Sequence, residues 1–240
     1  MTATGKLAID GGKLVRSSPM PERGLIGPEE KKAVVGLLDE CIRTRKAFGY
    51  NGPSEKQYEK DFVRFMGGGY ADGVNSGTNA VFCALGALQL PPFSEVIVPP
   101  ITDPGGVMPV PMLGCIPVVA DSDPRSYNTS AAQIRPMITS RTRAIVVAHI
   151  GGEPVDMPPI MALAKKHKLQ VVEDCAQAHG ARLGGKLVGT FGHIAAFSTM
   201  FGKHHCTGGQ GGVVYTRDPD LHWRGRRFAD RGKPFNIQAP

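Results

Sequence analysis

An acid and a lysine in two separate segments of the chain have the residue types and the placement for cofactor chemistry. Asp174 ends the apolar run LQVVED, and Lys203 follows the run AAFSTMFG in a glycine-rich stretch. A carboxylate can keep a heterocyclic nitrogen protonated, and a lysine can form a Schiff base with an aldehyde. The two residues together therefore indicate pyridoxal phosphate (PLP), a cofactor that needs both groups.

Each of these residues also has an ordinary structural interpretation. Asp174 could be the N-cap of a helix that begins after it, and Lys203 could be a solvated surface lysine. The position of Lys203 between an apolar run and the GGQGG turn favours the cofactor. Gln177 lies three residues after Asp174 and could pack against the cofactor ring or reach its phenolic oxygen.

The segment NSGTNAVFCAL predicts a strand, a turn of small residues and then a helix. The backbone N–H groups of Gly77 and Thr78, with the hydroxyl of Ser76 or Thr78, would lie at the N-terminus of this helix. Such a terminus binds a phosphate dianion. An ordinary capped turn between a strand and a helix would have the same sequence, so both interpretations stay open.

The whole chain alternates between short apolar runs and helical patterns, which predicts an α/β fold. Runs such as AIVVAH and LQVVED are apolar throughout, as strands are when helices cover both faces of a mostly parallel sheet. Ligands bind such sheets beyond the carboxyl ends of the strands. Strands are expected at Tyr70–Asn75, Glu95–Pro99, Ile116–Asp121, Ala144–Ile150, Leu169–Asp174, Ile194–Thr199 and Gly212–Thr216. Helices are expected at 28–41, from an N-cap at Ser54 to Phe65, and at Gly77–Gln89, Pro104–Leu113, Ala131–Ile138 and Pro158–Lys168.

The composition favours a soluble cytoplasmic enzyme. The 240 residues include 41% hydrophobic and 20% charged residues, and no apolar run approaches the ~18–20 residues that span a membrane. The N-terminus lacks the apolar segment of a signal peptide. Five widely spaced cysteines predict reduced thiols rather than disulfides.

The charge pattern gives little support to a nucleic-acid partner or a metal. The net charge is +7, and basic residues gather between Arg224 and Lys233, but no nucleic-acid motif accompanies them. An exposed helix face or a contact with a phosphorylated small molecule explains them better. His204, His205 and Cys206 are consecutive and lack the spacing of metal ligands, so no metal site is expected.

Together, the ordered segments resemble the DegT/StrS family of sugar aminotransferases, which are PLP enzymes of fold type I. The resemblance covers nearly the whole chain and implies a three-layer α/β/α large domain with a mostly parallel sheet. It also implies transfer of an amino group from glutamate or glutamine to a keto-sugar, either a sugar nucleotide or a cyclitol, by a homodimer. The matching segments are LAIDGGKLVRS, the Gly52-Pro53 turn, NSGTNA, VIVPPIT, DSDPRSYN, EDCAQAHGA, FGKHHCTGGQGGVV and ADRGKPF.

The resemblance implies a role for each matching residue. Lys203 would hold PLP and move the proton, Asp174 would pair with the pyridine nitrogen, and Gln177 would lie beside the ring hydroxyl. Ser198 would contact the phosphate, while His179 matches a common family histidine without an assigned role. The implied cofactor-binding set is Ser76, Gly77, Thr78, Asp174, Gln177, Ser198 and Lys203.

Two departures from the family pattern qualify this expectation. Many members stack an aromatic residue on the PLP ring at the position that Asp103 occupies here. Members also continue beyond ADRGKPFNIQAP into a smaller C-terminal domain. We expect an N-terminal helical segment at 1–66, a PLP-binding domain at 67–217 and the start of a truncated C-terminal region at 218–240.

Two other functions remain as alternatives. Sugar dehydratases share the fold and the cofactor but replace the lysine by histidine, and His204 stands next to Lys203. A catalytically incomplete fragment that keeps only the cofactor-binding domain is the second alternative. Lys203 argues against the dehydratase, and the shortness of the chain supports the fragment.

Overall fold

A computed structural model describes residues 5–20, 22 and 24–234. The first four residues of the predicted N-terminal segment and the last six of the predicted C-terminal region lie outside this description. The chain divides into two compact units, residues 1–46 and 47–240. The first contains a short 3₁₀ turn, η1 (Ala8–Asp10), and helix α1 (Pro28–Thr44). Pro28 begins α1 at its first position, where a missing N–H costs no hydrogen bond.

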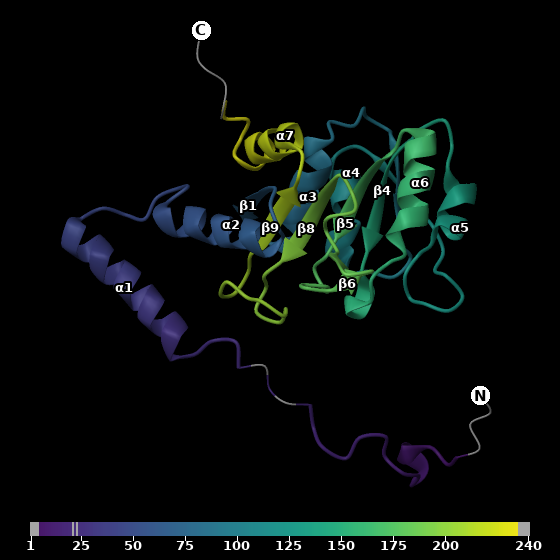
Figure 1. The fold of residues 1–240 in the computed structure, drawn as a ribbon, viewed down its shortest axis with the longest axis horizontal. Coiled ribbons are helices and arrows are strands. Elements are labelled where there is room, and N and C mark those ends of the chain that lie inside the picture. Colours follow the sequence, from purple (N-terminus) through teal and green to yellow (C-terminus); the bar gives the residue numbers. More distant parts are fainter. Residues whose placement is uncertain (1–4, 21, 23, 235–240) are drawn as a thin grey trace. The chain divides into compact units, whose positions relative to one another are not determined.

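A seven-stranded sheet forms the centre of the second unit, in the order β1-β9-β8-β5-β4-β2-β3 (Figure 1). Strand β9 runs antiparallel to both of its neighbours, and the remaining pairs are parallel, which confirms the predicted mostly parallel sheet. The strands are β1 (Tyr70–Val74), β2 (Glu95–Val98), β3 (Ile116–Val119), β4 (Thr142–Ala148), β5 (Gln170–Asp174), β8 (Ile194–Ser198) and β9 (Gly212–Thr216). A separate two-stranded ribbon pairs β6 (Arg182–Leu183) with β7 (Lys186–Leu187).

Helices cover both faces of this sheet. Successive strand residues point to opposite faces, so Val96 and Val98 pack in a core under α3 (Gly77–Ala87) and α7 (Pro219–Ala229). Ile97, between them, packs in the opposite core under α6 (Met157–His167). Helix α2 (Pro53–Phe65) covers β8 and β9 on that second face through Phe62. The predicted three-layer α/β/α arrangement is therefore confirmed.

Prolines and glycines shortened several predicted helices. Pro104–Leu113 was expected to be one helix but forms a 3₁₀ turn, η2 (Pro104–Gly106), and the short α4 (Pro109–Met112). The expected helix Ala131–Ile138 ends early because Pro136 cannot donate a helical hydrogen bond. It consists of α5 (Ala131–Ile134) and the 3₁₀ turn η3 (Arg135–Met137). Another 3₁₀ turn, η4 (Ile150–Gly152), follows β4.

The N-cap of α2 also differs from the prediction. Gly52 is the N-cap and Pro53 is the first helical residue, so Ser54 lies inside the helix. The rigid proline ring has the backbone angle of a helix start, and it sets the beginning of the helix two residues earlier. The boundary predicted at Ser54 is therefore wrong by two residues.

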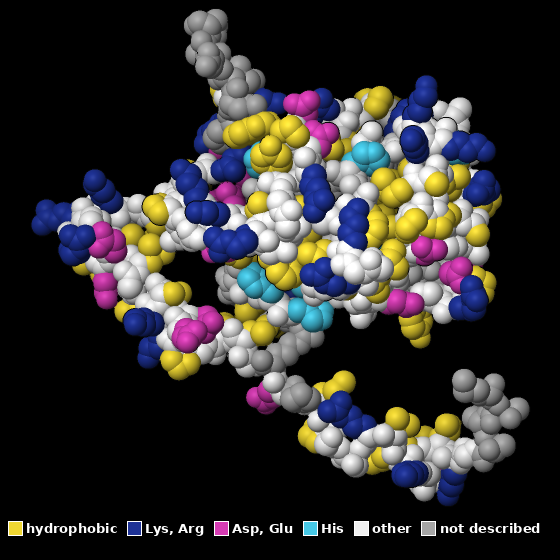
Figure 2. Space-filling model, in the orientation of Figure 1, with side chains coloured by type: hydrophobic (Ala, Val, Ile, Leu, Met, Phe, Trp, Pro, Cys, Tyr) yellow, Lys and Arg dark blue, Asp and Glu magenta, His cyan; other side chains and the backbone are white. Residues whose placement is uncertain are grey.

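The surface of the second unit carries its basic residues in a scattered pattern. On the face that Figure 2 shows, Lys and Arg are spread over the surface among hydrophobic, acidic and neutral side chains. Within the described residues, no helix has the length and apolar character needed to cross a membrane. All five cysteines are unpaired, and Cys83, Cys115 and Cys175 are buried.

Candidate active site

The carboxyl ends of three strands bring most of the predicted site residues to one edge of the sheet. Asp174 ends β5, and Ser198 ends the neighbouring parallel strand β8. Ser76 follows β1, which runs parallel to β8 because each is antiparallel to β9. A ligand beyond this edge would therefore meet residues from all three strands.

The turn at the start of α3 has the geometry of an anion site. Ser76 is the N-cap, and its Oγ accepts the Asn79 N–H at 3.1 Å. The first-turn N–H groups of Gly77 and Thr78 have no acceptor within the helix. A Cβ built on Gly77 would lie 2.5 Å from the Cβ of Ser198, so this turn and Ser198 are in direct contact. The predicted phosphate-binding residues thus form one cluster.

Asp174 is a buried acid that lacks a full counter-charge. The residue is 7% exposed, and its Oδ1 accepts the Ala176 N–H at 3.0 Å. Burial raises the pKa of its carboxyl, while the Ala176 N–H and the Lys203 charge partly oppose this shift. The residues that follow form turns rather than a helix, so the alternative helix-cap role of Asp174 is not observed. A bound cation would stabilise the carboxylate.

A buried network behind Asp174 was missed by the sequence analysis. Glu173 is fully buried, and its carboxylate accepts the N–H groups of Gly189, Phe191 and Gly192 at 2.7, 2.8 and 2.5 Å. His149 adds a fourth contact through Nε2 at 3.1 Å. A glutamate within the apolar run LQVVED was the available signal, since a buried charge requires such donors.

His149 connects this network to the backbone of Asp174. The Val155 N–H donates to Nδ1 of His149 at 2.9 Å, which leaves the ring proton on Nε2 to bond Glu173. The His149 N–H donates to the Asp174 carbonyl oxygen at 3.1 Å. His149, Glu173 and Cys175 have potential ligand atoms within 4.8 Å of one another. The hydrogen bonds above already occupy the imidazole of His149 and the carboxylate of Glu173. The cluster therefore holds the carboxyl end of β5 in place.

Gln177 is oriented by the loop after β4. Its Oε1 accepts the Gly151 N–H at 2.8 Å. Because the carbonyl side of the amide is engaged, the NH₂ group remains as the donor. Gln177 can therefore donate to an anionic ring oxygen, which is compatible with the expected position beside the PLP hydroxyl.

Lys203 lies in the loop that joins β8 to β9. This loop is closed by hydrogen bonds between the hydroxyls of Thr199 and Thr207 at 2.7 Å and from Phe201 N–H to the Gly209 carbonyl at 3.2 Å. The Lys203 N–H donates to the Met200 carbonyl at 2.9 Å. Lys203 is partly buried, and its charge opposes part of the rise that burial causes in the pKa of Asp174. These features favour the site over the alternative of a solvated surface lysine.

Two aromatic residues outside the predicted set hold the same loop. His179 Nε2 contacts the Ser198 carbonyl oxygen at 2.8 Å, and burial lowers the His179 pKa to about 4, so the neutral ring donates this bond. The Tyr58 hydroxyl contacts His205 Nε2 at 2.9 Å, and their rings stack with centroids 5.6 Å apart. Helix α2 therefore contacts the lysine loop directly. No local sequence pattern indicated this pairing.

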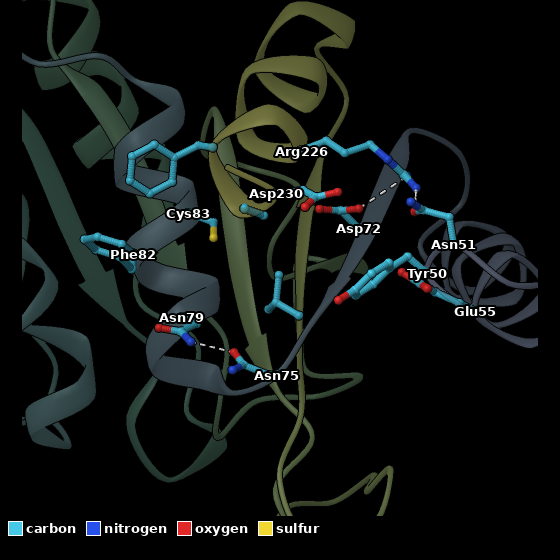
Figure 3. A pocket seen from close by; sticks show the side chains of 14 residues that line it. Tyr50, Asn51, Glu55, Asp72, Asn75, Asn79, Phe82, Cys83, Arg226 and Asp230 are labelled. Carbon is cyan, nitrogen blue, oxygen red and sulfur yellow. Dashed lines mark hydrogen bonds and ion pairs between the residues drawn. The ribbon is translucent and has the colours of Figure 1, made fainter. Parts of the chain in front are cut away.

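Arg226, from the basic cluster of the sequence, is not on an exposed helix face. Its Nη1 lies 3.2 Å from Asp72 and 3.6 Å from Glu59, and its side chain is 14% exposed. Burial raises the pKa of Asp72 to about 7, although Arg226 opposes the shift. Figure 3 shows Arg226 reaching from α7 toward Asp72 and Asn51 above a cavity of about 430 Å³. The ion pairs of Arg226 with Asp72 and Glu59 therefore link α7 to β1 and α2.

Known proteins resemble the chain in both sequence and structure. Residues 28–238 match the model of the DegT/DnrJ/EryC1/StrS aminotransferase family. A UDP-N-acetyl-3-dehydro-alpha-D-glucosamine 3-aminotransferase of Acidithiobacillus ferrooxidans is 42% identical over 75% of the chain and 49% of the relative. An L-glutamine:2-deoxy-scyllo-inosose aminotransferase of Micromonospora echinospora is 32% identical over 98% of the chain and 56% of the relative.

Solved structures have the same fold. An aminotransferase from Psychrobacter cryohalolentis superposes with a TM-score of 0.83 and 36% identity, over 93% of the chain and 56% of that structure. NtdA of Bacillus subtilis, solved with the bound cofactor PMP, superposes with a TM-score of 0.81 and 27% identity, over 94% of the chain and 51% of that structure. The chain spans about half the length of these relatives. By the extent of the family match, it belongs to the DegT/DnrJ/EryC1/StrS aminotransferase family.

Proposed function

We propose that this chain is a PLP-dependent aminotransferase that passes an amino group from glutamate or glutamine to a keto-sugar, either a sugar nucleotide or a cyclitol. The observation that carries the proposal is the position of Asp174. This buried acid shares a sheet edge with the Gly77–Thr78 turn. Burial raises the pKa of its carboxyl, and the charge of Lys203 partly opposes this rise. PLP requires these three groups: an anion site for its phosphate, an acid for its ring nitrogen and a lysine for its aldehyde.

The residues present fit PLP. Gly77 lies against Ser198 with no room for a Cβ, so its backbone can approach a phosphate closely. Asp174 needs a cationic partner that the described side chains supply only in part, and a protonated pyridine nitrogen would provide it. When bound, PLP supplies an aldehyde that reacts with amines and a ring that withdraws electrons from the adjacent carbon.

The protein residues would divide the remaining work. Lys203 would hold the cofactor and then carry a proton to and from the substrate carbon. Asp174 would keep the ring nitrogen protonated, and the Gln177 NH₂ group would donate to the ring oxygen. His179, neutral at physiological pH, would fix the Ser198 carbonyl and thereby the start of the lysine loop.

The names of the relatives support the substrate class. They include an aminotransferase for a UDP-linked keto-sugar and one that uses L-glutamine and an inosose. The PMP in NtdA supports the cofactor, since PMP is the amino form of PLP. Lys203 supports amine transfer over dehydration, because its charge is one of those that act on the Asp174 carboxyl, whereas His204 is exposed.

Labelling the lysine tests the proposed cofactor chemistry. After incubation with PLP, borohydride reduction and peptide mapping should place the label on Lys203, and Lys203→Ala should abolish it. Loss of the visible PLP band on adding glutamate or glutamine would then report the first half of amine transfer. Label on another lysine, with none on Lys203, would contradict the assignment.

We further propose a homodimer in the cytoplasm. The family resemblance supports the dimer, and the unpaired thiols of the five cysteines support a reducing compartment. Sedimentation velocity of the purified chain tests the first proposal. A monomer at all concentrations up to about 100 µM, well above the μM range of weak dimers, would contradict it.

A further inference from the structure

The turn from Asp103 to Gly106 lies between the two ends of the candidate cofactor site. A Cβ built on Gly105 would overlap the hydroxyl of Thr78, which belongs to the phosphate-binding turn. A Cβ on Gly106 would lie 3.0 Å from Asp174 Oδ2. Because consecutive Cα atoms are only about 3.8 Å apart, Gly105 and Gly106 form one short stretch of backbone. This stretch contacts Thr78 and Asp174, the residues that would hold opposite ends of the cofactor.

Asp103 fixes the shape of this turn. Its Oδ1 accepts the Gly105 N–H at 2.9 Å, and its carbonyl accepts the Gly106 N–H at 2.9 Å. Pro104 restricts the intervening backbone angle. Gly106 is buried, whereas Asp103 is exposed. The side chain of Asp103 is thus used to hold the backbone, which an aromatic side chain at this position could not do.

We propose that the Asp103–Gly106 turn forms a wall of the cofactor pocket, with its backbone packed on the PLP ring where many family members use an aromatic side chain. The turn also sets the spacing between Thr78 and Asp174. Glycine is the residue that lets a backbone approach a ligand this closely. The inference rests on the proposed function and adds a cofactor-binding role for Asp103, Gly105 and Gly106.

Titration of the PLP-free protein with PLP, followed by visible absorbance, tests this role. In Gly105→Ala, the Thr78 hydroxyl must rotate away, and in Gly106→Ala the Asp174 carboxylate or Thr102 must shift. We expect each variant to weaken PLP binding on the order of tenfold or more. Gly36→Ala, at an exposed position of α1 with open space around it, is the matched control and should bind as wild type.

Two substitutions of Asp103 separate its hydrogen bond from its charge. Asp103→Asn keeps an oxygen that can accept the Gly105 N–H and should retain PLP affinity within about twofold, as a neutral exposed exchange does. Asp103→Ala removes the acceptor and should weaken PLP binding by about fivefold, the worth of one ordinary hydrogen bond. Melting temperatures of the PLP-free variants show whether a loss comes from general unfolding.

A double substitution identifies the contact responsible. In a Thr78→Ala background the overlap with residue 105 is relieved, so Gly105→Ala should add little further loss. Wild-type PLP affinity in both Gly105→Ala and Gly106→Ala would overturn the proposed wall, and so would an undiminished effect of Gly105→Ala in the Thr78→Ala background. Failure of the wild-type chain itself to bind PLP would instead overturn the proposed function.

Discussion

Replacing Asp174 by Asn changes the charge at the centre of the proposed site and little else. Asn keeps an oxygen that can accept the Ala176 N–H, so the local turn should remain. Burial raises the pKa of the Asp174 carboxyl in the folded protein. The fold therefore becomes less stable as pH rises above the unfolded pKa, because the carboxyl must ionise while it is buried. Asp174→Asn is therefore expected to raise the melting temperature of the PLP-free protein at neutral pH.

The effect on catalysis should have the opposite sign. Asp174 is 7% exposed, so water would screen its pairing with a protonated ring nitrogen only weakly. Removing one partner of a buried ion pair costs about 3–5 kcal/mol. If that cost falls on the transition state, the rate of amine transfer should decrease roughly 10²- to 10⁴-fold, at ~1.4 kcal/mol per factor of ten.

A single-turnover assay separates these two effects. The PLP-loaded variant is mixed with glutamate or glutamine, and the decay of the visible band is followed. Asp156→Asn, which changes an exposed acid in the same unit, is the charge-matched control and should react as wild type. Near-normal decay in folded, PLP-bound Asp174→Asn would refute the ion pair, and a lower melting temperature without PLP would refute the stability argument.

Three further substitutions test the supporting structure. Glu173→Leu leaves buried N–H groups without an acceptor and should cost about 3 kcal/mol or more in the free energy of unfolding, and an unchanged urea midpoint would contradict this network. The pKa of Asp72 is raised to about 7, so stability should fall as pH rises from about 4 to about 7. Asp72→Asn should flatten this dependence, and an identical pH profile of the melting temperature in the variant would disprove the assignment. Tyr58→Phe removes the bond to His205 and should slow amine transfer by about fivefold, for a loss of about 1 kcal/mol; wild-type kinetics would show that this contact does not position the lysine loop.

Local patterns in the sequence were sufficient to predict the strands that carry the site. Val171 and Val172 put apolar side chains on both faces of the run LQVVED, which forms the buried strand β5. Gly77–Ala87 forms a helix capped by Ser76, as the turn residues indicated. Helix ends near proline were less accurate. Pro53 and Pro136 each moved a boundary, because the effect of a proline depends on which helical position it occupies.

The sequence alone determined the residue types at the strand ends, and with them the cofactor that we propose those residues hold. The tertiary structure decided which distant residues meet. Tyr58 reaches His205 across 147 residues, and Gly105 meets Thr78 because β1 and β2 end at the same edge of the sheet. The partners of Glu173 were equally hidden, since three of its donors are backbone N–H groups, which every residue except proline carries. Local spacing cannot encode such contacts, because they depend on the order of strands in the sheet and on the approach of backbone to backbone.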